Sequence, residues 1–214
     1  SLTWYYRESV FAWLLAPARG RLSPFDGLPV FTTPTEMFTS TVQLALAGGA
    51  VASVPMVVLG AFRLLIRYLP PREQRFVLTF FPAVILFYVA GAAFAYYVLL
   101  PTGLNFLLGF GDGVAVPTIR ISDYVSIMTA MLFWLGVVFE LPLVMFLLAK
   151  LRLVSYLRFR KFRKLVPATA FVLSAVITPT FDVINQALVA LPIIVLYEIG
   201  LFLAWTARPP EMRT

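Results

Sequence analysis

The 214-residue sequence contains neither cysteine nor histidine. Their absence excludes disulfide bonds, Cys/His metal sites, a cysteine nucleophile and a histidine base. Charged residues are scarce as well, at 13% of the chain, against about 25% in soluble domains. The sequence also lacks a phosphate-binding loop and a nucleophile elbow. We therefore expect a protein that is not an enzyme and that binds no metal and no cofactor.

Hydrophobic residues make up 61% of the chain, and they form long continuous runs. Continuous runs predict membrane-spanning helices, whereas a membrane barrel would alternate polar and apolar residues. The predicted fold is an all-α integral membrane protein with one membrane domain over residues 1–214. Its first part, residues 1–37, mixes aromatic and charged side chains, which is typical of an external interfacial segment. Five spans are expected, at about 38–62, 76–100, 124–149, 165–181 and 187–205, and the last two are short.

Lysine and arginine are concentrated in the predicted loops after the first and third spans and in the C-terminal tail. In a five-span arrangement these segments share one side of the membrane, and the positive-inside rule makes that side cytoplasmic. The net charge of +7 is thus explained without nucleic acid. The C-terminus is expected in the cytoplasm and residues 1–37 outside. Because residues 1–37 are expected outside and contain no signal peptide, a further span is predicted to precede Ser1.

Glu140 is the single charged residue within the apolar run 127–149. A carboxylate at this depth is costly unless it is neutral, paired, or turned toward a partner or a cavity. Pro142 follows two residues later, and a proline removes a helical hydrogen bond and exposes a backbone carbonyl group. The motif from Gly136 to Pro142 therefore predicts a polar docking or conduction point in the membrane. The alternative is a structural polar contact between packed spans.

Three further polar side chains lie in or beside the last two predicted spans. Glu198 lies inside the fifth span, Gln186 directly precedes it, and Asp182 lies in a tight hairpin. Intramembrane carboxylates could serve a proton-coupled small-solute transporter, which is an alternative function class, or could be structural groups in a membrane scaffold. A bond from Glu198 to a neighbouring helix, and capping of the fifth span by Gln186, are the simpler alternatives.

Glu73 is the single acidic residue among the arginines of the first basic loop. A local salt bridge with Arg72 or Arg75 is the simpler interpretation. A carboxylate at the cytoplasmic surface could also bind a cationic guest, because arginine binds carboxylates through two parallel hydrogen bonds. The second basic loop, residues 150–164, contains seven basic residues and no acid, and it predicts a membrane surface that faces anionic headgroups.

Seven short motifs follow one another along the chain: Ala16-Pro17; Pro34-Thr35-Glu36-Met37-Phe38; Arg72-Glu73-Gln74-Arg75; Gly91-Ala92-Ala93-Phe94-Ala95-Tyr96 with Pro101; Gly136-Val137-Val138-Phe139-Glu140-Leu141-Pro142; Thr178-Pro179 with Asp182 and Gln186; and Pro192 with Tyr197-Glu198. In this order they resemble the TatC family, the multispan core subunit of the twin-arginine (Sec-independent) protein translocase. The resemblance implies a concave helical bundle with six spans in the family.

The resemblance also implies a function. A TatC-like protein is expected to receive the twin-arginine signal peptides of folded cargo and to recruit single-span TatA/TatB-type subunits, with transport driven by the proton-motive force. We expect a homo-oligomer within a larger complex, in a bacterial-type cytoplasmic (inner) membrane or, for an organellar homologue, a thylakoid or mitochondrial inner membrane. By position the resemblance assigns signal-peptide binding to Glu73, Arg72 and Arg75, partner-helix contact to Glu140, Gln186 and Glu198, and the external cap and hairpin to Pro17 and Asp182.

The sequence departs from the family pattern at three places. The family's N-terminal cytoplasmic motif Ser-His-Leu-x-Glu-Leu-Arg and its first span are absent from the sequence. Arg67-Tyr68-Leu69 stands where the family has Pro-Gly-Leu. The hairpin reads Thr-Pro-Thr-Phe-Asp where the family usually has Thr-Pro-Pro-Asp, which displaces Asp182 by one position.

Overall fold

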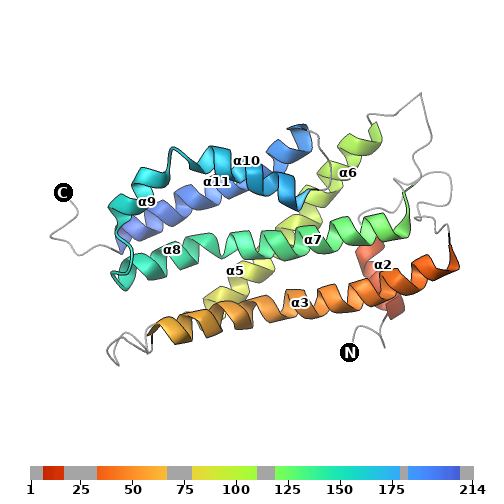
Figure 1. Ribbon diagram of the computed structural model, residues 1–214, viewed down its shortest axis with the longest axis horizontal. Coiled ribbons are helices and arrows are strands. Elements are labelled where there is room, and N and C mark those ends of the chain that lie inside the picture. The colour runs from red at the N-terminus through yellow and green to blue at the C-terminus, as the bar shows by residue number, and fades with distance from the viewer. Residues whose placement is uncertain (1–6, 17–32, 67–78, 110–118, 179–182, 208–214) are drawn as a thin grey trace. The chain divides into compact units, whose positions relative to one another are not determined.

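The computed structural model describes residues 7–16, 33–66, 79–109, 119–178 and 183–207 (Figure 1). Almost all of these residues are helical, which confirms the predicted all-α class for this part of the chain. The elements are α2 (Arg7–Leu15), α3 (Pro34–Ile66), α5 (Phe81–Phe94), the π-helical turn η2 (Ala95–Leu99), α6 (Leu100–Gly109), α7 (Ile121–Phe139), α8 (Leu141–Lys150), α9 (Tyr156–Phe162), α10 (Val166–Ile177) and α11 (Val183–Thr206).

Among the described residues, four helical stretches are long and apolar enough to cross a membrane: Thr35–Leu64, Pro82–Phe106, Ile121–Lys150 and Val183–Thr206. They match the first, second, third and fifth predicted spans. The predicted fourth span corresponds to α10, which has only 12 residues. At about 1.5 Å per residue α10 is shorter than a hydrocarbon core of about 30 Å. The prediction of a short fourth helix is therefore confirmed, whereas α11 has 24 residues and is not short; the total of five spans remains a prediction.

Three predicted helix boundaries are wrong. The chain stays helical to Gly109, although a loop was expected from residue 101, because Pro101 falls in the first turn of α6, where a missing N–H costs little. Helix α10 ends at Ile177 and Thr178 is extended, which is earlier than the predicted end at residue 181. Helix α11 begins at Val183, so Gln186 lies inside this helix and does not precede it.

Two compact units are distinguished in the chain, and the first comprises residues 1–52 and 92–134. In this unit the C-terminal end of α2 is held by two tyrosines. The Tyr96 hydroxyl donates to the Trp13 carbonyl oxygen at 2.5 Å, and the Tyr124 hydroxyl donates to the Leu14 carbonyl oxygen at 2.8 Å. The rings of Trp13 and Tyr96 also stack with centroids 4.3 Å apart. The phenols thus satisfy carbonyl groups that a helix end leaves without partners.

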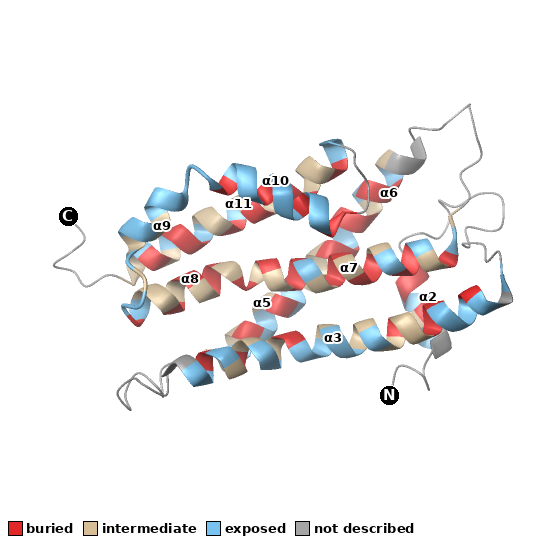
Figure 2. Cartoon of the chain, in the orientation of Figure 1, coloured by how far each residue is buried: buried red, intermediate tan, exposed pale blue. Residues whose placement is uncertain are grey.

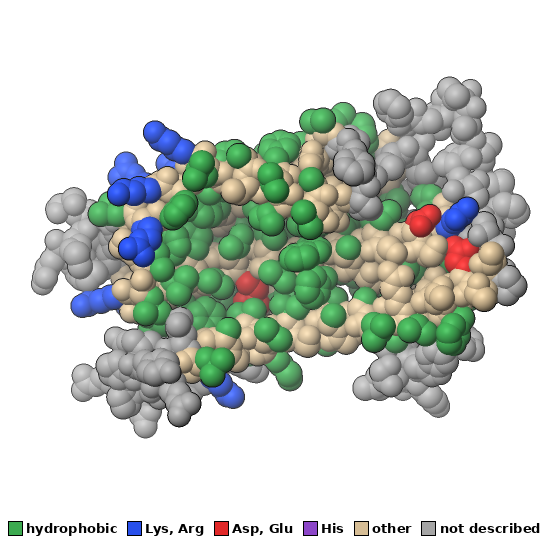
Figure 3. All heavy atoms as spheres, in the orientation of Figure 1, with side chains coloured by type: hydrophobic (Ala, Val, Ile, Leu, Met, Phe, Trp, Pro, Cys, Tyr) green, Lys and Arg blue, Asp and Glu red, His purple; other side chains and the backbone are tan. Residues whose placement is uncertain are grey.

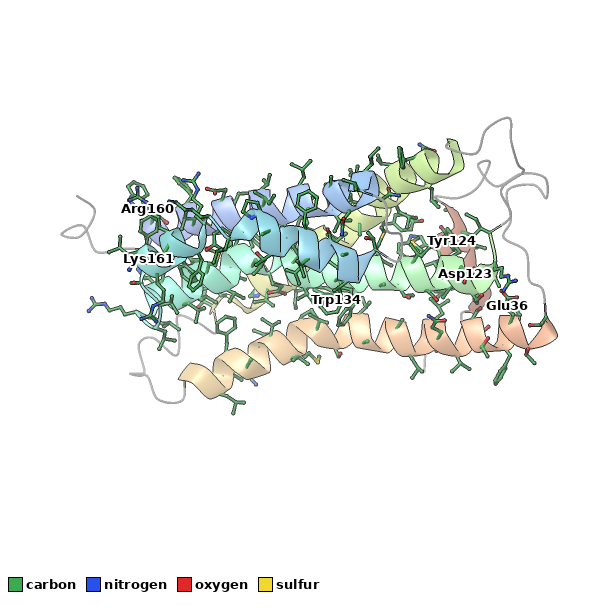
Figure 4. The ribbon with its side chains drawn as sticks, turned by 45° about the horizontal axis from the view of Figure 1, so that its top comes forward. Glu36, Asp123, Tyr124, Trp134, Arg160 and Lys161 are labelled. Carbon is green, nitrogen blue, oxygen red and sulfur yellow. The ribbon has the colours of Figure 1, made fainter. Side chains whose placement is uncertain are left out.

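Polar side chains join the beginnings of α3 and α7 in the same unit. One oxygen of the buried Glu36 accepts hydrogen bonds from the Ser122 hydroxyl at 2.7 Å and from the Ser122 backbone N–H at 3.4 Å. Figure 4 shows Glu36 and Asp123 on these adjoining helix ends. Farther along, the Gln43 amide donates to Ser126 at 2.9 Å. A carboxylate at the N-terminal turn of α7 is favoured by the helix dipole, so Glu36 fixes the two helices at this end.

The second unit comprises residues 53–91 and 135–214. Helix α11 packs against α8 and α10, and buried residues follow the inner faces of these helices (Figure 2). A further apolar cluster joins the end of α3, α5 and α8; its buried members are Leu59, Phe62, Val84, Leu143, Leu147 and Leu151. The second unit contains Glu140, and its packing determines what surrounds that residue.

Glycines allow three close helix contacts in the second unit. A Cβ atom added at Gly91 would lie 2.6 Å from the Leu135 carbonyl oxygen, and one at Gly136 would lie 2.6 Å from Cζ of Tyr88. A Cβ atom at Gly200 would lie 2.6 Å from the Met145 sulfur. Such distances are shorter than van der Waals contact, so no side chain fits at these positions without displacing its neighbour.

We expect Gly136→Ala to destabilise the protein by about 1–3 kcal/mol, the usual range for overpacking in a tight contact. Gly60→Ala is the matched control, because a Cβ atom at Gly60 meets no atom within 4 Å. The control should leave stability unchanged or raise it by up to about 1 kcal/mol, since alanine is the better helix former. Thermal unfolding of both variants in detergent measures the difference. Equal melting temperatures would mean that α5 and α7 do not pack closely at Gly136.

Candidate functional site

The candidate residues are distributed unequally over the structure. Pro17, Arg72, Glu73, Arg75 and Asp182 lie outside the described residues, so their assignments remain predictions. The three candidates for partner-helix contact are described, and all belong to the second unit. Their surroundings differ strongly, and they are therefore considered one at a time.

Glu140 occupies the break between α7 and α8. Its backbone N–H donates to the Val137 carbonyl oxygen at 3.1 Å, which makes a tight turn, and Pro142 stands in the first turn of α8. The side chain is buried, with 2% of its surface exposed. Neither carboxyl oxygen forms a hydrogen bond within the described part of the chain. A buried polar group without a hydrogen bond costs about 1–3 kcal/mol, which makes Glu140 a candidate functional residue.

Tyr88 of α5 is a second buried polar residue of this unit, and it was not among the predicted site residues. Its side chain is buried with 3% exposed, and the hydroxyl has no hydrogen bond to any described residue. The ring lies against Gly136, one helical turn before Glu140. The available signal was a single hydroxyl in an otherwise apolar helix, because α5 reads FPAVILFYVAGAAF.

Gln186 and Glu198 bind other parts of the same unit. The Gln186 amide donates to the Phe171 carbonyl oxygen of α10 at 3.3 Å. An oxygen of Glu198 lies 2.7 Å from Nε of Arg163 in an ion pair whose side chains are 39% and 58% exposed, respectively. Exposed ion pairs contribute about 0–1 kcal/mol, so this pair adds little to stability. The Glu198 contact agrees with the simpler alternative of a bond to a neighbouring segment, whereas Gln186 bonds to α10 and does not cap the helix.

The three candidates do not form one cluster. Gln186 and Glu198 are 12 residues apart on α11, which corresponds to about 18 Å along a helix. Glu198 is held near the basic segment by Arg163, and Gln186 is in the first turn of α11, next to α10. Glu140 alone combines complete burial with a carboxyl group that has no hydrogen bond in the described residues. The site is therefore centred on Glu140 and Tyr88.

The chain matches the family model described as "Sec-independent protein translocase protein (TatC)" over residues 1–192. The chain belongs to the TatC family. Among curated TatC proteins, that of Carboxydothermus hydrogenoformans is 36% identical over 182 residues, which cover 85% of this chain and 75% of the relative. The TatC protein of Aquifex aeolicus is 32% identical over 205 residues, which cover 94% of this chain and 83% of the relative.

Solved TatC structures agree with this assignment. The chain superimposes on the crystal structure of a twin-arginine translocase receptor, TatC, with a TM-score of 0.83 at 31% identity, over 96% of this chain and 90% of that chain. A second structure of a TatC receptor, in DDM, gives a TM-score of 0.82 at 31% identity. The family assignment, the all-α membrane fold and the predicted role in the twin-arginine translocase are thereby confirmed. This TatC chain is an integral membrane protein.

The basic segment of this TatC chain is exposed. Figure 3 shows Lys and Arg side chains gathered around the end of α8 and α9, and Figure 4 shows Arg160 and Lys161 on α9. The helix also exposes Leu157 and Phe162. Basic and apolar side chains together on a short helix between two apolar helices are typical of a membrane interface.

Proposed function

We propose that this chain is the receptor and core subunit of a twin-arginine protein translocase, which binds the twin-arginine signal peptides of folded proteins. The observation that carries the proposal is the TM-score of 0.83, at 31% identity over 96% of the chain, to a structure described as the twin-arginine translocase receptor TatC. Family membership over residues 1–192 supports it independently. The protein acts by binding and conducting its cargo and catalyses no reaction.

Signal-peptide binding is assigned to Glu73, which Arg72 and Arg75 flank. A carboxylate accepts two parallel hydrogen bonds from one guanidinium group, and Glu73 is the single acid of its loop. The flanking arginines repel a cationic guest that does not engage the carboxylate. Lysine cannot form the paired bonds, so this arrangement favours arginine over lysine in the signal peptide.

Recruitment of single-span TatA/TatB-type subunits is assigned to Glu140, with Gln186 and Glu198 as further contacts. Glu140 is buried and has no hydrogen bond to any described residue. A polar group on an incoming transmembrane helix would satisfy it within the bilayer. In this proposal the chain works in a bacterial-type inner membrane, as a homo-oligomer within a larger complex. Its C-terminus and the basic segment 150–164 lie on the cytoplasmic side, while Pro17 and Asp182 shape the external side.

Photo-crosslinking of a signal peptide tests the receptor function. A photoreactive twin-arginine peptide is offered to the reconstituted chain, and a twin-lysine peptide of otherwise identical sequence is the control. We expect crosslinks near Glu73 that require the two arginines. A parallel sample with a supplied N-terminal family span provides the motif that the sequence lacks. Equal crosslinking of both peptides, or none in either sample, would refute the receptor function, and small-solute uptake in proteoliposomes would then be measured.

A further inference from the structure

Tyr88 and Glu140 are two buried polar side chains with no hydrogen bond to any described residue, and the Tyr88 ring packs on Gly136, one helical turn before Glu140. Each group costs about 1–3 kcal/mol in this state. Buried polar groups normally form hydrogen bonds, so two exceptions in one place indicate a functional position. Both residues belong to the same compact unit, and α5 contributes no other hydroxyl or charged side chain.

The Tyr88 ring packs closely on Gly136 of α7, whereas no hydrogen bond to a described residue holds the Glu140 carboxyl group. A Cβ atom at Gly136 would meet Cε2, Cζ and Cδ2 along one edge of the Tyr88 ring, and the two nearest atoms, Cε2 and Cζ, are at its hydroxyl end. The phenol therefore lies directly over the backbone of α7, one turn before Glu140. Tyr88 has two side-chain torsions, and its ring is held by this packing. Glu140 has three torsions and lies in a break between helices, so its carboxyl group can rotate toward the fixed hydroxyl.

We propose that Tyr88 is a positioning residue for Glu140: its hydroxyl binds one carboxyl oxygen and leaves the other directed at a polar group of an incoming transmembrane helix. This proposal rests on the proposed function of Glu140 in recruiting single-span subunits. A carboxyl group with one bond already made presents a single orientation, so binding loses less side-chain entropy. The guest is an uncharged polar side chain, because a second charge in hydrocarbon would add a large cost.

Tyr88→Phe removes the hydroxyl and keeps the ring. Because phenylalanine retains the packing on Gly136, the variant tests the hydroxyl alone. The first readout is infrared: the carboxyl band of Glu140 is assigned as the band that disappears in Glu140→Gln. We expect this band to shift in Tyr88→Phe, because the carboxyl group loses a hydrogen bond. Tyr197→Phe is the matched control, since the Tyr197 hydroxyl donates to the Phe159 carbonyl oxygen at 2.8 Å, and it should leave the band unmoved.

The second readout is binding of a probe helix in nanodiscs. The probe is an oligoleucine transmembrane peptide with one central glutamine, and the all-leucine peptide is its control. We expect the glutamine probe to bind about three- to tenfold more weakly to Tyr88→Phe than to the unaltered chain, the range for a hydrogen bond between membrane helices. Tyr197→Phe should bind the probe as the unaltered chain does.

The outcomes are separable from those of the receptor test, because the probe contains no arginine and needs no signal-peptide site. A shifted band together with weaker binding supports the positioning role. An unmoved band overturns it, and so does a shifted band with unchanged or tighter binding of the probe. Equal binding of the glutamine and all-leucine probes to the unaltered chain would also overturn it.

Discussion

Replacing Glu140 by leucine should abolish assembly with the single-span subunits while the chain itself stays folded. Leucine fills a similar volume and removes the polar group that the incoming helix is proposed to bind. Neither carboxyl oxygen forms a hydrogen bond in the described residues, so the substitution loses at most the bond proposed to Tyr88. Removal of the buried carboxyl group offsets the loss of that bond, so the free energy of unfolding should change by no more than about 1–3 kcal/mol. Assembly should fall at least about tenfold, as expected when a buried polar contact between helices is lost.

Two measurements test this prediction. Site-specific crosslinking between the chain and a single-span subunit reports assembly, and the absence of native cysteine makes each introduced cysteine unambiguous. Thermal unfolding of the purified chain reports stability. Glu140→Gln is the matched control, because its amide can still hydrogen-bond and should retain part of the assembly. If Glu140→Leu melts at a lower temperature and still crosslinks normally, Glu140 is a structural contact within the chain.

Much of the fold could be predicted from the lengths of the apolar runs, and the wrong helix boundaries have local causes. Apolar runs located the four long helices, since a bilayer demands about 20 apolar residues per span. Pro101 was interpreted as a helix end, but proline is tolerated in a first turn, and the π-helical turn before it lets a new helix begin at Leu100. Gln186 was interpreted as preceding the fifth span, whereas it lies inside α11, where its amide donates to the Phe171 carbonyl oxygen of α10.

The site was only partly predictable, because its members meet through packing. Glu140 could be found from the sequence, because a single charged residue in an apolar run is energetically costly and therefore indicates a functional or structural role. Tyr88 could not, since its importance arises from the close contact with Gly136, 48 positions along the chain. Likewise, the ion pair between Arg163 and Glu198 joins residues 35 positions apart. It provides Glu198 with a partner in the same chain, which the resemblance alone did not indicate.

Reversing the charge of Glu73 should remove binding of twin-arginine signal peptides. In Glu73→Arg the bidentate acceptor is lost and a third arginine joins Arg72 and Arg75, so a cationic peptide meets repulsion in place of a paired hydrogen bond. Hydrogen bonds to charged groups contribute about 1.5–3 kcal/mol each, which predicts a loss of at least about tenfold in affinity. Fluorescence anisotropy of a labelled signal peptide on nanodisc-embedded chain measures the loss.

The matched control is Asp123→Arg, which makes the same change in charge at an exposed residue in the first turn of α7. This variant should bind the peptide as the unaltered chain does, because it keeps the Glu73 carboxylate although its net charge changes by the same amount. Affinity for the unaltered chain should also fall as salt rises, since exposed charges are screened beyond about 10 Å at 0.1 M. Equal losses in both variants would mean that net charge, and not the Glu73 carboxylate, binds the twin arginines.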